Sequence, residues 1–283
     1  MKNAKGSIYL LIAAFIWGTA FVAQSLGLNT VGAFTFNAVR NYIGALTLLP
    51  IILIFHRKEK ADIKKLWIGG ISCGIALTVA SSLQQVGIAE GTEAGKAGFI
   101  TALYIIFVPL FSLFTNKKPK PTIWLAVILA TVGMYLLCVK EGFTVQKGDI
   151  YVFWCAIAFA FHILIIDKFS AEVNPVKLSC VQFFICAIIS TILMLLFEEP
   201  NLNDIKFATL PLLYTGVLSS GVAYTLQAVG QKYSPPTLAT LIMSLESVFA
   251  VLAGWIILGE NMSFGEVIGS VLVFAGIIIA QIF

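Results

Sequence analysis

The sequence predicts an all-α membrane protein with ten transmembrane helices, arranged as two inverted five-helix repeats. Three observations support this fold class. Of the 283 residues, 59% are apolar and only 11% are charged, whereas soluble domains are usually about 25% charged. Ten apolar stretches are each long enough to cross a hydrocarbon core of roughly 30 Å, which takes about 20 helical residues. They form two similar sets of five, and an odd-numbered repeat must lie inverted relative to its copy.

The predicted spans follow one another with short connections. Lipid offers no partner for exposed backbone groups, so each span is expected to be a continuous helix. Pro109 is the exception, because it lies in mid-span and is expected to kink the fourth helix. The spans cover residues 7–27, 34–55, 66–86, 95–115, 122–139, 150–167, 176–197, 208–228, 237–258 and 264–282.

The distribution of basic residues predicts that both termini are cytoplasmic. With the N-terminus inside, thirteen of the 18 Lys and Arg residues fall on the cytoplasmic side, four on the outer side and one, Arg40, within a span. Membrane proteins concentrate Lys and Arg in their cytoplasmic loops. We therefore expect an integral membrane protein of a bacterial plasma membrane in this orientation.

An offset of 142 or 143 residues relates the two halves, residues 1–139 and 148–283, and each half is expected to form one five-helix unit. Any two apolar helices look alike, but matched Gly, Gln and Tyr positions at a nearly constant offset argue against chance. The matched positions are Gly6 with Gly148, Tyr9 with Tyr151, Trp17 with Phe159, Arg40 with Gln182, Gly133 with Gly276, Leu103 with Glu246, and LQQVG at 83–87 with LQAVG at 226–230.

Two charged residues stand inside predicted spans, where a charge costs about 3 kcal/mol on insertion scales. Glu246 lies near the middle of the ninth span. It either faces a cavity, where it meets a cationic group or carries a coupling proton, or it is a structural carboxylate between helices. Arg40 lies inside the second span. It either attracts a carboxylate or phosphate, or it snorkels outward or braces a neighbouring helix end.

Neutral polar and aromatic side chains complete the candidate site, with interhelical hydrogen bonding as the competing account. Gln24 and Thr101 are among the further donors inside spans. Gln84 and Gln227 are repeat mates and should reach the same depth from opposite halves. The candidate substrate-binding residues are Trp17, Gln84, Gln85, Tyr104, His162, Tyr224, Gln227 and Glu246, and the candidate coupling or gating residues are Glu246, Arg40 and Pro109.

Several strings resemble the EamA family of the drug/metabolite transporter superfamily. They are WGTAF at 17–21, AVRNY at 38–42, and ESVFAVLAGWIILGE at 246–260 followed by glycines at 265, 269 and 276. The resemblance covers nearly all the chain as two tandem units. It implies ten helices, cytoplasmic termini and a central cavity, in a family whose members mostly move small metabolites such as amino acids, many of them outward. Ser247 stands where the family commonly has Pro, so we expect a straighter ninth helix.

The motifs of other functional classes are missing from the sequence. There is no GxSxG or Walker motif, no metal-ligand spacing among the five Cys and two His residues, and no basic run interleaved with aromatics. We expect no enzymatic activity, no metal or other cofactor and no nucleic-acid partner. The expected function is a secondary transporter, an exporter of small polar metabolites that works by alternating access. Its expected partners are the substrate, the lipid bilayer and coupling protons. The alternatives are a flippase for lipids or lipid-linked sugars and a non-transporting membrane scaffold or sensor.

Overall fold

The computed structural model describes residues 2–57, 59, 62–114, 119–138, 145–258 and 263–282. Residues 1, 139 and 283, which bound the two expected units, lie outside this part of the chain, as do residues 259 and 260 of the string at 246–260. Within the described ranges every regular element is a helix and none is a strand. The all-α prediction is therefore confirmed for these residues.

The first half contains α1 (Lys2–Leu28), α2 (Ala33–Ile51), η1 (Ile52–His56), α3 (Ile63–Ala89), α4 (Ala94–Ala102), α5 (Tyr104–Ser112) and α6 (Pro121–Cys138). The second half contains α7 (Lys147–Ser170), α8 (Pro175–Phe197), α9 (Leu202–Phe207), α10 (Thr209–Leu213), η2 (Tyr214–Tyr224), α11 (Thr225–Gln231), α12 (Pro236–Met243), α13 (Leu245–Leu258) and α14 (Phe264–Ile282).

The described helices are those of an integral membrane protein. Six of them are long and apolar enough to cross a bilayer, and three shorter apolar helices cover residues 121–136, 236–252 and 267–282. Large apolar side chains such as Phe55, Leu195 and Phe197 are exposed on the outside of the bundle. Such a surface is stable against hydrocarbon and unstable against water.

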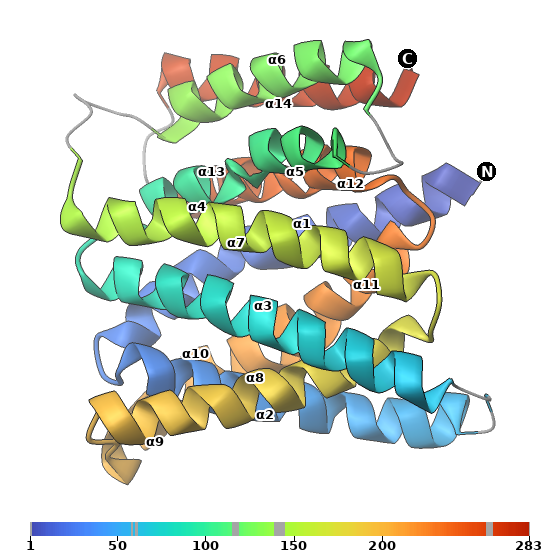
Figure 1. Ribbon diagram of the computed structural model, residues 1–283. Helices are drawn as coiled ribbons and strands as arrows, with labels where there is room; N and C mark the ends of the chain where they lie inside the picture. The colour runs from blue at the N-terminus through green and yellow to red at the C-terminus, as the bar shows by residue number, and fades with distance from the viewer. Residues whose placement is uncertain are drawn as a thin grey trace.

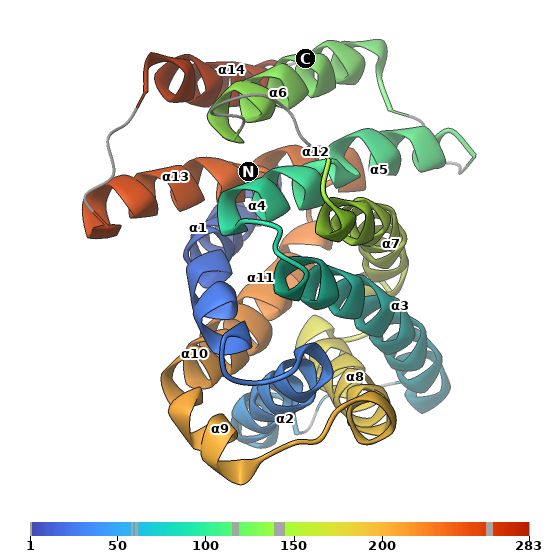
Figure 2. The same cartoon turned by 90° about the vertical axis from the view of Figure 1, so that its left-hand side faces the viewer.

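The helices run roughly side by side, and both termini lie at the same end of the bundle (Figure 1). The two views place α6 and α14 at one side and α2, α8 and α9 at the opposite side, with the remaining helices between them (Figures 1 and 2). The two outer groups thus enclose the remaining helices.

Corresponding helices of the two halves pack against each other in opposite directions. A Cβ atom added at Gly133 of α6 would lie 2.8 Å from the nitrogen of Val273 in α14, and one added at Gly276 would lie 3.3 Å from the nitrogen of Ala130. α6 and α14 therefore pack antiparallel to each other.

The same close contact between a glycine and an isoleucine occurs twice. The glycine belongs to the first half in one contact and to the second half in the other. A Cβ atom at Gly74 of α3 would lie 2.6 Å from the Cβ of Ile185 in α8 and 3.0 Å from the carbonyl oxygen three residues earlier. At Gly216 of η2 the corresponding distances, to Ile43 of α2 and to the carbonyl three residues before it, are again 2.6 and 3.0 Å. Both glycine–isoleucine pairs are related by an offset of 142 residues.

The fourth and ninth predicted spans are interrupted at residues where the sequence predicts no break. The fourth span breaks at Leu103, between α4 and α5, whereas Pro109 lies inside α5. The break is a tight turn in which the Leu103 nitrogen donates to Ile100 O at 3.2 Å and Ile106 N donates to Leu103 O at 2.9 Å. These bonds span three residues, as in a 3₁₀ helix, and Pro109 takes no part in them. The break at Leu103 is thus not the one that the sequence predicts from Pro109.

The ninth span is interrupted as well, at Ser244, between α12 and α13. The Ser244 hydroxyl donates to Leu241 O at 2.8 Å, and Ser247 N donates to Ser244 O at 3.2 Å. A serine side chain that bonds the preceding turn competes with the helical main-chain pattern. The expectation of a straighter ninth helix, drawn from Ser247, does not include this break three residues earlier. The breaks at Leu103 and Ser244 occupy nearly equivalent places in the two halves.

The eighth span is also not one continuous α-helix. Residues 209–231 form α10, the π-helical segment η2 and α11 in succession. Near the start of η2, the Thr215 hydroxyl donates to the Pro211 carbonyl at 2.7 Å, so this carbonyl is partly occupied by a side chain. π-Helical turns are rare and frequently mark functional sites.

The N-terminus of α2 is held by a carboxylate from the other half. Glu198, directly after α8, accepts from Phe34 N at 2.8 Å, Thr35 N at 2.8 Å and the Thr35 hydroxyl at 2.7 Å. The free N–H groups of a helix start favour such a negative charge. Glu198 thus fixes α2 to α8 at this end of the pair.

We predict that Gly74→Ala and Gly216→Ala each lower the free energy of unfolding by about 1–3 kcal/mol, because the added methyl group overlaps an isoleucine on the facing helix. Gly95→Ala is the matched control, since no atom lies within 4 Å of its added Cβ. The measurement is thermal unfolding in one detergent. Equal behaviour of all three variants would contradict the mirrored packing.

We predict that Glu198→Ala lowers the free energy of unfolding by about 1–2 kcal/mol, because the first N–H groups of α2 lose their acceptor. Glu199→Ala, which changes the exposed neighbouring carboxylate, should have little effect. Unfolding in detergent compares the two. A loss in Glu199→Ala as large as that in Glu198→Ala would mean that general charge, and not the cap, is responsible.

Candidate functional site

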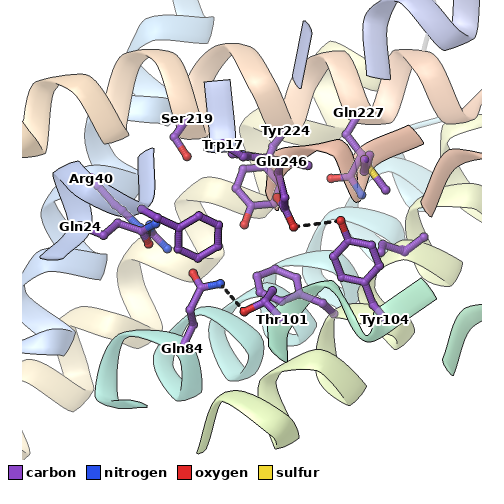
Figure 3. A pocket seen from close by; sticks show the side chains of 14 residues that line it. Trp17, Gln24, Arg40, Gln84, Thr101, Tyr104, Ser219, Tyr224, Gln227 and Glu246 are labelled. Carbon is purple, nitrogen blue, oxygen red and sulfur yellow. Dashed lines mark hydrogen bonds between the residues drawn. The ribbon is translucent and has the colours of Figure 1, made fainter. Parts of the chain in front are cut away.

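A cavity lies among the central helices, and both halves contribute to its wall (Figure 3). The volume available to water is about 40 Å³, room for roughly three water molecules. We call it the central cavity. It is lined by Trp17, Phe21, Gln24, Arg40, Gln84, Thr101, Tyr104, Phe159, Ile163, Ser219, Tyr224, Gln227, Met243 and Glu246.

Aromatic rings form much of the apolar wall. Trp17 of α1 meets Tyr224, the last residue of η2, edge to face with ring centroids 4.8 Å apart. Phe159, the repeat mate of Trp17, lines the cavity from α7. Edge-to-face contacts of this kind fix ring orientation and add to the energy of burial. The cavity therefore combines rigid aromatic surfaces with a smaller number of polar groups.

Glu246 and Tyr104 join the two halves across the central cavity. Each stands at the start of the helix that follows a break: Tyr104 is the first residue of α5, and Glu246 is the second of α13. The Tyr104 hydroxyl donates to Glu246 Oε1 at 3.0 Å, and both side chains are only 4% exposed. The positive end of a helix dipole favours a carboxylate near a helix start.

Arg40 lies inside the protein and does not snorkel to the surface. It is 3% exposed, and its Nη1 donates to Gln24 Oε1 at 3.0 Å. The same Gln24 oxygen accepts from Gln85 Nε2, and the guanidinium lies 5.8 Å from the centre of the Phe36 ring. Arg40 Nε is buried and has no partner among the residues that the structure describes. A network from α1 and α3 therefore positions this cation at the cavity wall.

The two buried charges do not pair with each other. Among the described residues, no carboxylate lies within ion-pair distance of Arg40, and the hydroxyl of Tyr104 is the hydrogen-bond partner of Glu246. Figure 3 shows Arg40 beside Gln24 at one side of the cavity and Glu246 beside Tyr104 towards the other. Unlike charges thus face the same small space from separate places.

The two glutamines that are repeat mates both line the central cavity. Gln84 Nε2 donates to the Thr101 hydroxyl at 3.1 Å. Gln227 is 1% exposed, and its Oε1 has no partner. The indole nitrogen of Trp17 is likewise buried without a partner. The wall thus has one hydrogen-bond acceptor and one donor that are not paired with any of the residues described.

Three of the sequence-predicted residues do not line the cavity. Gln85 is fully buried behind it and holds Gln24. His162 is fully buried as well; its Nε2 is 3.0 Å from Gln182 Oε1, and its ring packs edge to face against Tyr224. Pro109 is buried within α5. Gln85 and His162 therefore lie one layer behind the wall.

The sequence reasoning missed several lining residues. Phe21, Ile163 and Met243 are apolar residues in apolar spans, so their types carry no signal. Ser219 is polar but small, and it reaches the wall from η2. Gln24, recognised as an intramembrane donor, gains its place because it holds Arg40. Its spacing to Arg40 in the sequence does not indicate this contact.

Comparison with known proteins gives consistent findings. The sequence model of the EamA-like transporter family matches residues 4–139 and again residues 146–281. A protein of Archaeoglobus fulgidus described as an uncharacterized transporter is 31% identical over 284 residues, covering 100% of this chain and 87% of its own length. The threonine/homoserine exporter RhtA of Escherichia coli is 27% identical over 267 residues, covering 90% and 84%.

A solved crystal structure has the same fold. It superimposes with a TM-score of 0.82 at 18% sequence identity and covers 98% of this chain and 96% of the other. At this level of identity the likeness concerns the fold alone.

We predict that the Tyr104–Glu246 hydrogen bond couples the two halves. In a double-mutant cycle of Tyr104→Phe and Glu246→Leu, the interaction energy should be about 1–2 kcal/mol, because Tyr104→Phe removes the donor of this buried bond and Glu246→Leu removes its acceptor. Unfolding in detergent supplies the four free energies. Strict additivity of the two changes would show that the bond contributes nothing. Tyr135→Phe, which alters an exposed ring on α6, is the control.

Proposed function

Because the chain belongs to the EamA-like transporter family, we propose that it is a secondary transporter that exports small polar metabolites, amino acids among them, by alternating access. In this proposal residues 1–139 and 148–283 form two inverted five-helix units with ten membrane crossings in all. The units rock against each other around a fixed central site. Both termini face the cytoplasm, across a bacterial plasma membrane.

One observation carries the proposal: the central cavity lies between the two halves and holds two buried charges. Charged residues inside a membrane protein are costly, and they mark substrate or ion pathways by default. A non-transporting scaffold would gain nothing from such a cavity. The contacts of Tyr104 with Glu246 and of Arg40 with Gln24 keep the charges in place while no substrate is bound.

The arrangement of the helices supports the inverted repeat. α6 and α14, which correspond in the two halves, run antiparallel, and the Gly74–Ile185 contact has its counterpart in Gly216–Ile43. The two termini at one end of the bundle agree with an even number of crossings (Figure 1). Interrupted helices at equivalent places of two repeats are a frequent setting for a substrate site near mid-membrane.

The site residues take different roles in this proposal. Trp17, Gln84, Tyr104, Tyr224 and Gln227 contact the substrate together with Arg40 and Glu246, and Glu246 is also the group that carries a coupling proton. Gln85 and His162 position these residues from behind. Pro109 limits the hydrogen bonding of α5, the helix that carries Tyr104.

The size of the central cavity fits a carrier between its open states. Its 40 Å³ holds roughly three waters, whereas an amino acid is several times larger than a water molecule. Helices on the two sides must therefore separate to admit a substrate. The relative RhtA, whose name states threonine and homoserine, supplies a first solute for the test.

We predict that proteoliposomes containing the protein release L-threonine faster than protein-free vesicles, and that an imposed proton gradient changes this rate. Glu246→Gln should reduce the gradient-dependent rate by about tenfold or more, because the amide cannot gain or lose a proton at that place. Glu199→Gln, which changes an exposed carboxylate that does not line the cavity, is the control and should transport like the wild type.

Efflux of radiolabelled solute is the measurement, with a panel of polar metabolites beside L-threonine. Release of none of them above the protein-free rate would overturn the transport function. Flux that keeps its full proton dependence in Glu246→Gln would remove only the coupling role of this residue.

A further inference from the structure

We propose that the central cavity recognises a zwitterion, with Arg40 taking the carboxylate of the substrate and Glu246 taking its ammonium group. This inference rests on the proposed function, because it concerns what the same cavity binds. It goes further in assigning one charge of the substrate to each half of the protein.

The argument begins with charge balance. Arg40 and Glu246 line the central cavity, and among the described residues no Lys or Asp accompanies them there. Both are almost fully buried, where water cannot stabilise them and a charge needs a partner. They do not supply that partner to each other. A ligand with one negative and one positive group would satisfy both at once.

The surroundings of Arg40 suit a carboxylate. A guanidinium presents donors in a planar fork that matches two carboxylate oxygens. Gln24 occupies Nη1, while Nε is buried and has no partner within the part of the chain that the structure describes. Gln85 holds Gln24 from behind, so the fork is fixed before a ligand arrives. Because the guanidinium is preorganised in this way, less conformational entropy is lost when an anion binds.

The surroundings of Glu246 suit an ammonium group. Tyr104 donates to Oε1, which leaves the second carboxylate oxygen available for another donor. The aromatic residues Trp17, Tyr104 and Tyr224 lie on the same wall. Ring faces attract cations, so an ammonium group gains there as well as from the carboxylate.

Solutes with a single charge are expected to bind poorly. A monocarboxylate would neutralise Arg40 but leave Glu246 buried and unmatched, and an amine would do the reverse. Sites that contain buried polar groups reject analogues that fail to pair them. The pair of charges is thus a selectivity device and not only a source of affinity.

The test measures equilibrium binding to the full-length protein in lipid nanodiscs by titration calorimetry, without any gradient. The ligands are the proteinogenic L-amino acids and, for each one that binds, its carboxamide and its 2-hydroxy acid. The carboxamide lacks the negative charge and the hydroxy acid lacks the positive one. We expect each analogue to bind about 10- to 100-fold more weakly than the amino acid.

Two variants separate recognition from folding. Arg40→Gln introduces the residue found at the equivalent position of the other half, Gln182, and should abolish the preference for the amino acid over its carboxamide only. Glu246→Gln should abolish the preference over the hydroxy acid only. If Arg40 and Glu246 only stabilised the fold, each variant would bind the amino acid, its carboxamide and its hydroxy acid more weakly by the same factor. If either variant fails to fold, the wild-type analogue series decides by itself, and Glu199→Gln is the control.

Equal binding of an amino acid and either analogue, or no binding of any amino acid, would overturn the zwitterion assignment. So would an equal loss of all ligands in both folded variants. Binding with the expected selectivity in a protein that moves no solute would uphold the assignment and end the transport proposal. Transport of solutes with a single charge, without a preference for zwitterions, would uphold the transport proposal and end the zwitterion assignment.

Discussion

A carboxyl group in the middle of a membrane protein needs a hydrogen-bond donor, and Glu246 takes its donor from the opposite half of the chain. The Tyr104 hydroxyl reaches Glu246 at 3.0 Å, and each residue begins the helical segment after a break. The two breaks bring the starts of α5 and α13, with their positive dipole ends, to the buried centre. The breaks, the cavity and the joining of the halves therefore depend on one another at this contact.

Close packing around this centre explains why small residues matter. Gly74 and Gly216 allow α3 and η2 to approach isoleucines of α8 and α2, and the same distances recur at both places. Membrane helices gain little from the hydrophobic effect against each other, so they associate through such tight van der Waals contacts. The outer pair of α2 and α8 is held further by Glu198, whose carboxylate serves the first N–H groups of α2.

Much of the fold was predictable because it depends on local chemistry. Apolar length indicates the helices α3, α6, α8 and α14, and matched residues such as Gly133 and Gly276 indicate the repeat. The breaks at Leu103 and Ser244 were not predictable, because no proline or glycine stands at either place. Arg40 could be placed in a span but not on a cavity wall, since its partners Gln24 and Gln85 come from other helices. The sequence indicates how deep in a span a side chain lies, whereas the packing of the helices decides which way the side chain points.

The two halves share an outline, yet they differ at the cavity. Arg40 corresponds to Gln182, and Glu246 corresponds to Leu103. Had each half to assemble with an identical copy of itself, every charge near the axis would appear twice, and like charges would repel within a buried space. Joining duplicated segments in one polypeptide lifts that restriction. A single chain can therefore place a cation in one half of its core and a carboxylate in the other. A symmetric homodimer of either segment could not have this asymmetric charge distribution.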